Sequence, residues 1–379
     1  MALVLTEEQR LLQDTAKDFL ANNAPVAALR KLRDEKDPLG YAPDLWQKMV
    51  EMGWTSIILP ESYGGLEFGF QGLGVVLEES GRTLAASPLF ASAVVGASAI
   101  LLGGNEEQKQ TLLPSVASGE LTLALALEES PHHRPTQIST TATAQGDSFV
   151  LNGSKCFVLD GHSADQLIVV ARSSGGERDS SGLTLLLVER DAHGVSCQRT
   201  ILMDSRNAAD IQFDNVTVPA ANVIGQVDQG WEVLQPVLDR GRVAIAAEMM
   251  GVALEAFERT TAYLKEREQF GQLIGSFQAL QHRQAHIQSE IELCRSVLLQ
   301  ALSTVDDAPR ELPLLASLAK TKLNELVKLV TNEAVQMHGG IGVTDDLDIG
   351  FFLKRARVAM QIFGDTGYHK DRYATLCGY

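Results

Sequence analysis

The sequence has few basic residues relative to its acidic ones. Its 32 lysines and arginines stand against 48 aspartates and glutamates, which gives a formal net charge of −16. Proteins that bind nucleic acids or anionic membranes through charge carry clustered basic patches. The composition therefore argues against both kinds of partner, although acidity by itself identifies no ligand.

Cysteine is also scarce, and no two of the four cysteines have the C-x-x-C spacing of a zinc knuckle or a redox motif. Disulfide-stabilised domains are small, secreted and much richer in cysteine. The pattern predicts no disulfide framework and favours a reducing compartment. The single cysteines are Cys156, Cys197, Cys294 and Cys377.

Long apolar runs are missing as well. The stretch from Val94 to Leu102 is far shorter than the ~20 residues that a membrane-spanning helix needs. The stretch Met1 to Glu8 has no basic segment before its short apolar run, which a secretory signal would have. We therefore expect an untargeted cytoplasmic protein without a membrane span, whose 379 residues, 45% of them hydrophobic, can bury a large core.

Several well-known catalytic motifs are absent. The sequence contains no G-x-G-x-x-G, no Walker A loop, no H-E-x-x-H and no G-x-S-x-G, so dinucleotide, nucleoside-triphosphate, metalloprotease and serine-hydrolase functions lose support. His282 and His286 are four residues apart on an expected helix, but no carboxylate completes a metal site there. The pairs His132-His133 and Glu128-Glu129 are interpreted as surface groups, and no metal is predicted.

The order of structural signals along the chain is helix, sheet, helix. Thr6-Glu-Glu-Gln9 is a capping box that predicts a helix start, and helical spacing continues to about residue 119. From about 120 to 225 β-forming segments dominate, and the Asn152-Gly153 pair between them predicts a hairpin turn. Further strands are expected at 167–171, 183–188, 195–201 and 211–218.

After Pro219 long helical patterns return, at about 230–264, 276–305 and 314–338, and Gly339-Gly340 closes the last of them. This order excludes the alternation of strand and helix in a Rossmann sheet. We expect an α+β protein with three domains. They are an N-terminal α-helical domain (1–119), a central antiparallel β-sandwich or barrel (120–225) and a C-terminal four-helix bundle (226–379).

Two segments carry the main functional signal, Arg267-Glu-Gln-Phe-Gly271 and Gln336-Met-His-Gly-Gly-Ile-Gly342. Together they resemble the flavin-binding signatures of the acyl-CoA dehydrogenase family. Three more segments match that family in the same order along the chain, so the resemblance covers nearly the whole sequence. They are Leu59-Pro-Glu-Ser-Tyr-Gly-Gly65, Asn105-Glu-Glu-Gln-Lys109 and Leu151-Asn-Gly-Ser-Lys155.

The resemblance implies FAD as the cofactor. Arg267 would reach the pyrophosphate of a flavin that is bound mainly by a neighbouring subunit, because a guanidinium can bind phosphate oxygens in a bidentate way. Glycine at 339 and 340 would let backbone amides approach the cofactor, and Phe157 would pack on the flavin ring. The other residues implied to contact FAD are Gln269, Phe270, Gln278, Gln336 and Thr366.

Two segments depart from the family pattern in the central domain. Where family members usually have Thr-Glu-Pro and Gly-Ser-Asp, this chain has Glu128-Glu-Ser-Pro-His-His-Arg-Pro135. The family's Trp-Ile-Thr is replaced by Phe157-Val-Leu159, so a threonine hydroxyl near the flavin is missing. These side-chain contacts with the flavin cannot be transferred to this chain.

The catalytic base is the open question. Removing the α-proton of a thioester needs a carboxylate with a raised pKa and donors for the enolate oxygen. The family carries its glutamate at the positions aligned with Gly364 or Gly241, and both are glycine here. Asp365, one residue further on, is the first candidate and Glu248 the second. The Gly364 amide would contribute to the oxyanion site, and Arg242 matches a family arginine near the active site.

The resemblance therefore predicts an FAD-dependent acyl-CoA dehydrogenase of fatty acid β-oxidation. It would form a trans-2-enoyl-CoA and pass electrons to an electron-transferring flavoprotein. An alternative is a structural subunit without a base in a heteromeric enzyme, and a third possibility is a flavin oxidase. Phe363 to His369 resembles a branch described as the pimeloyl-CoA dehydrogenase small subunit. We expect a homotetramer or a heteromer with a related subunit, and the acyl chain is not determined.

Overall fold

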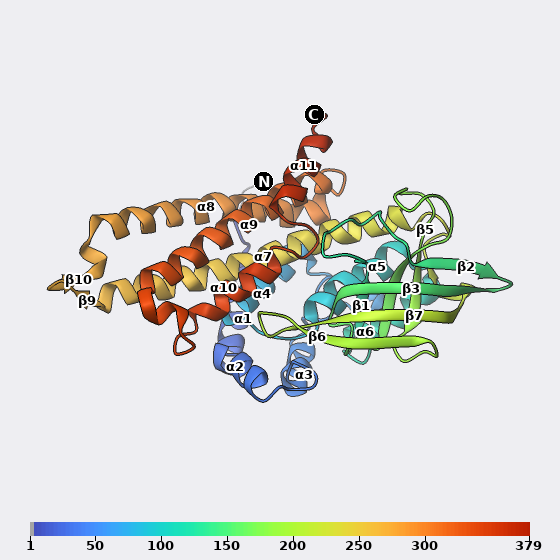
Figure 1. Ribbon diagram of the computed structural model, residues 1–379, viewed down its shortest axis with the longest axis horizontal. Coiled ribbons are helices and arrows are strands. Elements are labelled where there is room, and N and C mark those ends of the chain that lie inside the picture. The colour runs from blue at the N-terminus through green and yellow to red at the C-terminus, as the bar shows by residue number, and fades with distance from the viewer. Residues whose placement is uncertain (1–3) are drawn as a thin grey trace. The chain divides into compact units, whose positions relative to one another are not determined.

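The computed structural model describes residues 4–379, so Met1–Leu3, the start of the N-terminal stretch considered above, lie outside it. The described chain forms two compact units. Unit 1 contains residues up to 31, 70–85 and 242–379, and unit 2 contains residues 32–69 and 86–241. Helices occupy the first and last parts of the sequence and strands the middle (Figure 1), as predicted. The three domain boundaries stay a prediction.

The first helix begins where the capping box predicts it. The Thr6 hydroxyl accepts a hydrogen bond from the Gln9 N–H, and the Gln9 side chain accepts one from the Thr6 N–H. Both bonds satisfy backbone donors that a helix start leaves free. The N-terminal helical elements are α1 (Glu7–Asn23), α2 (Val26–Asp34), α3 (Pro43–Glu51), η1 (Glu61–Tyr63), α4 (Gly69–Thr83), η2 (Leu89–Gly96), α5 (Ala97–Gly103) and α6 (Glu106–Ala117).

Unit 2 contains an eight-stranded sheet in the order β6-β7-β3-β2-β4-β5-β8, with β1 paired to β4. Neighbouring strands are antiparallel, except that β1 runs parallel to β4 and one bridge joins β2 to β4 in parallel. The strands are β1 (Leu123–Ala126), β2 (Thr141–Gln145), β3 (Ser148–Leu159), β4 (Gln166–Arg172), β5 (Leu183–Glu189), β6 (Val195–Ile201), β7 (Asn207–Pro219) and β8 (Val223–Ile224). The four later strands predicted from the sequence are confirmed.

The prediction of a turn at Asn152-Gly153 is wrong, because this pair lies inside β3. The β2–β3 turn is at Gly146-Asp147, with Gln145 opposite Ser148. Asn152 instead marks a β-bulge, where its side-chain oxygen accepts a hydrogen bond from the N–H of Asn215 on β7. Asn215 has φ +51°, the left-handed conformation that asparagine tolerates better than other non-glycine residues.

Unit 1 is built from long helices. They are α7 (Gly230–Glu266), which begins in unit 2, α8 (Gln278–Asp307) and α9 (Leu312–His338), followed by the shorter α10 (Ile349–Ala359) and α11 (Thr366–Leu376). Helix α9 packs against α8, α10 and α11. The sequence predicted the three long helices but did not resolve the two short ones.

Helices α4 and α7 approach each other through glycine. A Cβ added at Gly81 would lie 2.1 Å from the carbonyl oxygen of Glu248, and one added at Gly251 would lie 1.7 Å from that of Glu78. Side chains at either position would force the two backbones apart. The two glycines therefore set the spacing between α4 and α7 next to Glu248.

Candidate functional site

The hairpin end of unit 1 consists of residues 267–273 and 336–343. Strands β9 (Glu268–Gln269) and β10 (Gln272–Leu273) follow α7 and form a hairpin with a two-residue loop (Figure 1). Phe270 and Gly271, at its tip, have φ of +56° and +77°, as a tight hairpin turn requires. A phenylalanine is strained in this conformation, and the Phe270 residue is 91% exposed. Strain and exposure of a bulky aromatic together are a sign of a binding site.

The two signature segments meet at this end. The ring of Tyr263, near the end of α7, stacks on His338 at the end of α9 with a centroid distance of 4.4 Å. The Gln284 side chain of α8 also donates a hydrogen bond to the Met337 sulfur. These contacts hold the ends of three helices together, so that both signature segments belong to one surface.

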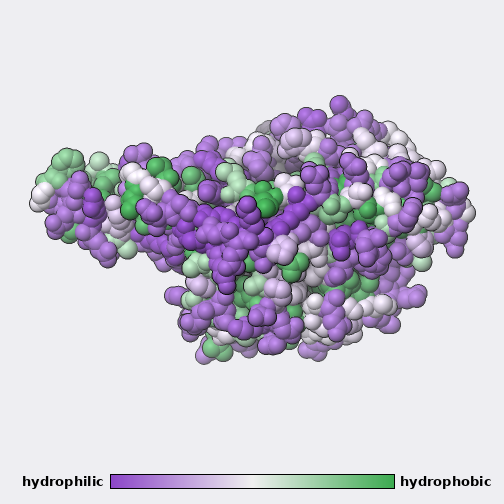
Figure 2. Space-filling model, turned by 60° about the horizontal axis from the view of Figure 1, so that its bottom comes forward, coloured by the Kyte–Doolittle hydropathy of each residue, from purple (hydrophilic) through white to green (hydrophobic). Residues whose placement is uncertain are grey.

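The groups expected to bind FAD at this end are accessible. A Cβ at Gly339 or Gly340 would meet no atom within 4 Å, so the space in front of both glycines is open. Gly339 has φ +67° and ends α9, donating its N–H to the Gln336 carbonyl. Figure 2 shows pale and green atoms among purple ones at the end that carries β9 and β10. The exposed residues there are Arg267, Gln269, Phe270, Gln278, Gln336, Gly339 and Gly340.

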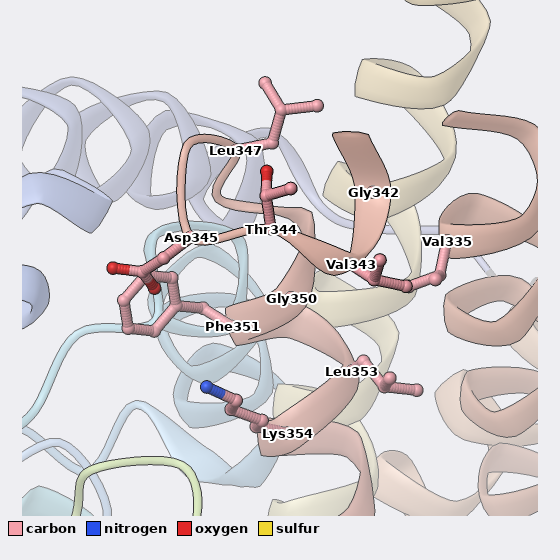
Figure 3. A pocket seen from close by; sticks show the side chains of 10 residues that line it. All are labelled: Val335, Gly342, Val343, Thr344, Asp345, Leu347, Gly350, Phe351, Leu353 and Lys354. Carbon is pink, nitrogen blue, oxygen red and sulfur yellow. The ribbon is translucent and has the colours of Figure 1, made fainter. Parts of the chain in front are cut away.

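A pocket of about 260 Å³ lies beside the glycine segment, on the connection between α9 and α10. Figure 3 shows Asp345, Phe351 and Lys354 on one side of the view and Val335, Val343 and Leu353 on the other. The Asp345 carboxylate pairs with Arg30 at 2.8 Å. None of the four predicted catalytic residues lines this pocket.

Phe157 lies in unit 2 on a second bulge of β3. The strand pairs Lys155 with Ile211 and Val158 with Ala209, so Cys156 and Phe157 share a single opposing residue on β7. Phe157 has φ +51° and is half-buried. The bulge therefore breaks the regular alternation of side chains along β3 and changes the direction of the Phe157 ring. This direction suits a contact with a ring system outside the sheet.

The segment that departs from the family is more buried than predicted. The Glu129 carboxylate lies 2.7 Å from the ammonium of Lys155, which is fully buried, and accepts hydrogen bonds from the N–H groups of Ser139 and Thr140. Burial raises the pKa of Glu129, but Lys155 and these bonds outweigh it and hold that pKa below its ordinary value.

Glu128 pairs with His133, whose side chain is only 4% exposed. The interpretation of these histidine and glutamate pairs as surface groups is therefore wrong for Glu128, Glu129 and His133. The reason is that residues 128–140 fold back over β3, which the local sequence does not show. Within unit 2, Glu129 is thus held in an ion pair with Lys155, and Glu128 is in contact with a histidine.

The α10–α11 turn, residues 360–365, carries the predicted base and oxyanion groups. The ammonium of Lys320 on α9, itself fully buried, donates to the carbonyls of Ala359, Met360 and Gly364 at 3.1 Å each and to Asn324 at 3.0 Å. Burial lowers the pKa of Lys320 well below its ordinary value, the Arg242 guanidinium lowers it further, and Asp365 opposes the shift. Lys320 thus fixes both ends of the turn.

The centre of the turn is fixed from two other helices. The Phe363 carbonyl accepts hydrogen bonds from Arg242 Nε on α7 and from a ring nitrogen of His369 on α11, each at 3.1 Å. Arg242 also donates to the Tyr368 hydroxyl at 3.3 Å, and its guanidinium lies 5.5 Å from the centre of that ring. The predicted arginine therefore belongs to this turn.

The Gly364 N–H and the Asp365 carboxylate, the two groups expected to act in catalysis, are both used in structural hydrogen bonds. The Gly364 N–H donates to the Gln361 carbonyl at 3.3 Å. The Asp365 side chain is the N-cap of α11 and accepts a hydrogen bond from the Tyr368 N–H at 2.8 Å. Asp365 is exposed, and Thr366 is the first residue of the helix that it caps. The Asp365 carboxylate is therefore engaged by the backbone of α11 and is not enclosed in a dry pocket.

Glu248, the second candidate base, is buried but already paired. Its two carboxylate oxygens accept hydrogen bonds from Nε and a terminal nitrogen of Arg355 on α10, both at 2.8 Å. Glu248 and Arg355 are 2% and 4% exposed. Because the guanidinium binds both carboxylate oxygens, the environment of Glu248 is that of a structural ion pair.

Three family models match the chain, by description the N-terminal, middle and C-terminal domains of acyl-CoA dehydrogenase, at residues 6–120, 128–216 and 228–375. The chain is 33% identical over 366 residues to the probable acyl-CoA dehydrogenase YngJ of Bacillus subtilis, covering 94% of each protein. The chain belongs to the acyl-CoA dehydrogenase family. It is an acyl-CoA dehydrogenase, an oxidoreductase that acts on the CH–CH group of acyl-CoA thioesters.

Further relatives of this acyl-CoA dehydrogenase differ in what they are described to do. Cyclohex-1-ene-1-carbonyl-CoA dehydrogenase of Geobacter metallireducens is 33% identical, with 96% of this chain and 95% of that protein covered. Two solved structures share its fold. One is of the electron transferring flavoprotein of Acidaminococcus fermentans (28% identity, TM-score 0.92, coverage 100% and 99%) and one is of the ChsE4-ChsE5 complex from Mycobacterium tuberculosis (26%, 0.90, 100% and 99%).

Within residues 4–379 of this acyl-CoA dehydrogenase, no group of three or more histidine, cysteine, aspartate or glutamate side chains is placed to hold a metal ion. His282 and His286 are both exposed on α8. In the same described part of the chain, no helix combines the length and the apolar character that crossing a membrane requires.

Sequence reasoning missed three members of the α10–α11 turn: Lys320, Tyr368 and His369. The signal for Lys320 was a lysine within the apolar spacing of α9, between the buried residues Ala316 and Leu323. A lysine at such a position is either exposed or held by several acceptors. Choosing between these required the position of the turn, which is more than 35 residues away in sequence.

Proposed function

We propose that this acyl-CoA dehydrogenase binds FAD and removes hydrogen from the α and β carbons of an acyl-CoA, giving a trans-2-enoyl-CoA. The hairpin end carries this proposal, because it presents a strained, exposed aromatic, an arginine and two open glycines on one surface. Such a surface is incomplete without a ligand or a neighbouring subunit. A bound FAD supplies the acceptor for the hydride from the β carbon.

The residues of the hairpin end suit the parts of FAD. Arg267 would bind the pyrophosphate through its guanidinium, and Phe270 would cover the adenine or ribose together with Gln269 and Gln278. The open space at Gly339 and Gly340 would receive the cofactor close to the backbone. In unit 2, the bulge that turns Phe157 would place its ring on the flavin, and Thr366 would contact the adenosine half.

The proton acceptor remains a proposal. Asp365 is the carboxylate next to the family's base position, and Asp365→Asn tests it cleanly, because asparagine also caps helices. Anaerobic addition of a suitable acyl-CoA should bleach the yellow protein. If Asp365 is the base, the Asp365→Asn protein should keep its colour and its fold but should not bleach. Unchanged bleaching in this variant would exclude Asp365.

A second candidate function is that of a subunit that lacks a base and acts with a related chain. The capping role of Asp365 and the ion pair of Glu248 favour it, since both carboxylates are already used. The similarity to the ChsE4-ChsE5 complex is consistent with a heteromer. Native mass spectrometry after co-expression with related chains from the same genome, together with turnover by the isolated chain, separates a heteromer from a homotetramer.

The electron acceptor is proposed to be an electron-transferring flavoprotein in the cytoplasm. The similarity to a chain in the structure of the Acidaminococcus fermentans flavoprotein supports this partner. The test is stopped-flow reoxidation of the substrate-reduced protein. Fast reoxidation by oxygen alone would favour an oxidase, and reoxidation that requires the flavoprotein would favour a dehydrogenase. A panel of acyl-CoAs scored by bleaching would determine the substrate and the branch of the family.

A further inference from the structure

The α10–α11 turn is surrounded by hydrogen-bond donors. Lys320 on α9 and Arg242 on α7 point their charged groups at its carbonyls, and His369 on α11 binds the same Phe363 carbonyl as Arg242. The carboxylate of the turn, that of Asp365, accepts a hydrogen bond from the Tyr368 N–H at the start of α11. An environment of this kind stabilises negative charge better than it accepts a proton.

Tyr368 occupies the space that a side chain at position 364 would need. A Cβ built on Gly364 would lie 2.5 Å from Cδ1 of Tyr368 and 2.9 Å from Nε2 of His369, and Gly364 has φ +114°. A glutamate at this position is therefore excluded without moving both rings. In this chain the half-buried phenol ring of Tyr368 lies in that space beside the turn.

Arg242 determines the chemistry that Tyr368 offers. The guanidinium donates a hydrogen bond to the phenol oxygen at 3.3 Å and lies 5.5 Å from the ring centre. When a hydroxyl accepts a hydrogen bond from a cation, its own O–H becomes a stronger donor, because the two bonds polarise each other. The expected alternative donor, the Gly364 N–H, is directed to the Gln361 carbonyl.

We propose that the Tyr368 hydroxyl, supported by Arg242, donates a hydrogen bond to the thioester carbonyl of the bound acyl-CoA and stabilises the enolate charge that develops as the α-proton leaves. This inference rests on the proposed function and identifies a catalytic residue of the same site. No covalent bond to Tyr368 forms or breaks, and Tyr368 does not accept the α-proton, which passes to the base.

The test compares Tyr368→Phe with Tyr373→Phe. Both variants remove one hydroxyl from α11, but Tyr373 lies five residues, more than one helical turn, further along the helix. The probe is the tightest binder of a straight-chain panel from butyryl-CoA to palmitoyl-CoA, labelled with ¹³C at the thioester carbonyl. Isotope-edited infrared difference spectra of the full-length protein, in its native complex, report how strongly the bound carbonyl is polarised without requiring turnover.

The expected result is a carbonyl band shifted to lower frequency in the wild type and in Tyr373→Phe, with most of this shift lost in Tyr368→Phe. Affinity should fall by about three- to tenfold, and kcat by about 100-fold with a smaller change in KM. An unchanged band in Tyr368→Phe, with tight binding, overturns this proposal and leaves the proposed function intact. Failure of the wild type to bind any acyl-CoA overturns both.

Discussion

The hairpin end and the α10–α11 turn of unit 1 both lie at helix ends. They differ in how far their backbone and side chains are engaged by the rest of the protein. At the hairpin end, Phe270 holds a strained conformation in the open, with one edge-on ring contact to Phe277, and the glycines face empty space. In the turn, the carbonyls of Phe363 and Gly364 are bound by buried side chains. The first surface is incomplete without a partner, and the second is completed by the chain itself.

This difference separates two tasks that a dehydrogenase combines. A cofactor surface must leave polar groups and backbone open until the ligand arrives. A surface that stabilises developing charge must be arranged in advance, with its donors already fixed. Substitutions test this contrast between a buried, closed part of unit 1 and an open hairpin end, from the largest expected change in the free energy of unfolding to the smallest.

The largest effect is expected for Glu248→Ala, which removes the Glu248 carboxylate from the buried Arg355 guanidinium. Breaking one side of a buried ion pair costs about 3–5 kcal/mol, measured by urea unfolding followed by circular dichroism. The control is Glu325→Ala, which breaks the exposed pair with Lys370 and should cost less than about 1 kcal/mol. A loss in Glu248→Ala no larger than the control would show that the pair is not structural.

The second effect concerns Lys320→Met, which removes the donor shared by three carbonyls of the turn. Leaving buried acceptors without a partner should cost about 2–3 kcal/mol at neutral pH. Since burial lowers the pKa of Lys320 in the folded state, the unfolded chain binds more protons between that pKa and about 10.4. The wild-type stability due to this residue therefore rises with pH across this window.

The check for Lys320 is urea unfolding at a series of pH values. Lys320→Met should lack the rise, so that the stability difference between wild type and variant grows as pH increases and levels off above about 10.4. Lys370→Met replaces an exposed lysine and should stay within about 0.5 kcal/mol of the wild type. A difference that shrinks as pH rises would contradict a lowered pKa of Lys320 in the folded state.

How much of this was accessible from the sequence depends on the range of the interactions. The start of α1 was predicted because Thr6 and Gln9 are three residues apart and complete the cap between themselves. The long helices and later strands followed from periodicity in the same way. The hairpin end was proposed as a cofactor site because its two segments resemble family signatures, and this role stays a prediction.

Most of the failures involve distant partners, whereas the capping contact of Asp365 with the N–H of Tyr368 is local and was overlooked. Asn152-Gly153 became a bulge because Asn215, on another strand, supplies the donor. Glu129 is paired because the loop folds back on β3 and reaches Lys155, and Glu128 contacts His133 within the same loop. Asp365 and Glu248 looked like available carboxylates until the N–H of Tyr368 and the guanidinium of Arg355 were located. A residue type predicts what a group is able to do, and its partners decide whether it is already engaged.

A third test compares glycines in the two regions. Gly364→Ala introduces a Cβ into a φ of +114° at 2.5 Å from the Tyr368 ring, and should cost about 1–2 kcal/mol. Gly340→Ala enters open space and should change stability by less than about 0.5 kcal/mol. Flavin content should respond in the opposite order, falling in Gly340→Ala. Equal destabilisation by both would remove the contrast between a closed turn and an open end.

The smallest effect on stability is expected for Arg267→Ala, because this side chain is exposed at the hairpin end. The free energy of unfolding should change by less than about 0.5 kcal/mol, while FAD affinity, measured by titrating the flavin-free protein, should fall about 10- to 100-fold with the loss of a charged hydrogen bond. Lys265→Ala, two residues earlier on α7, is the control and should retain FAD. If Arg267→Ala instead binds FAD normally, the open character of this end serves subunit contact alone, and the cofactor must be held elsewhere.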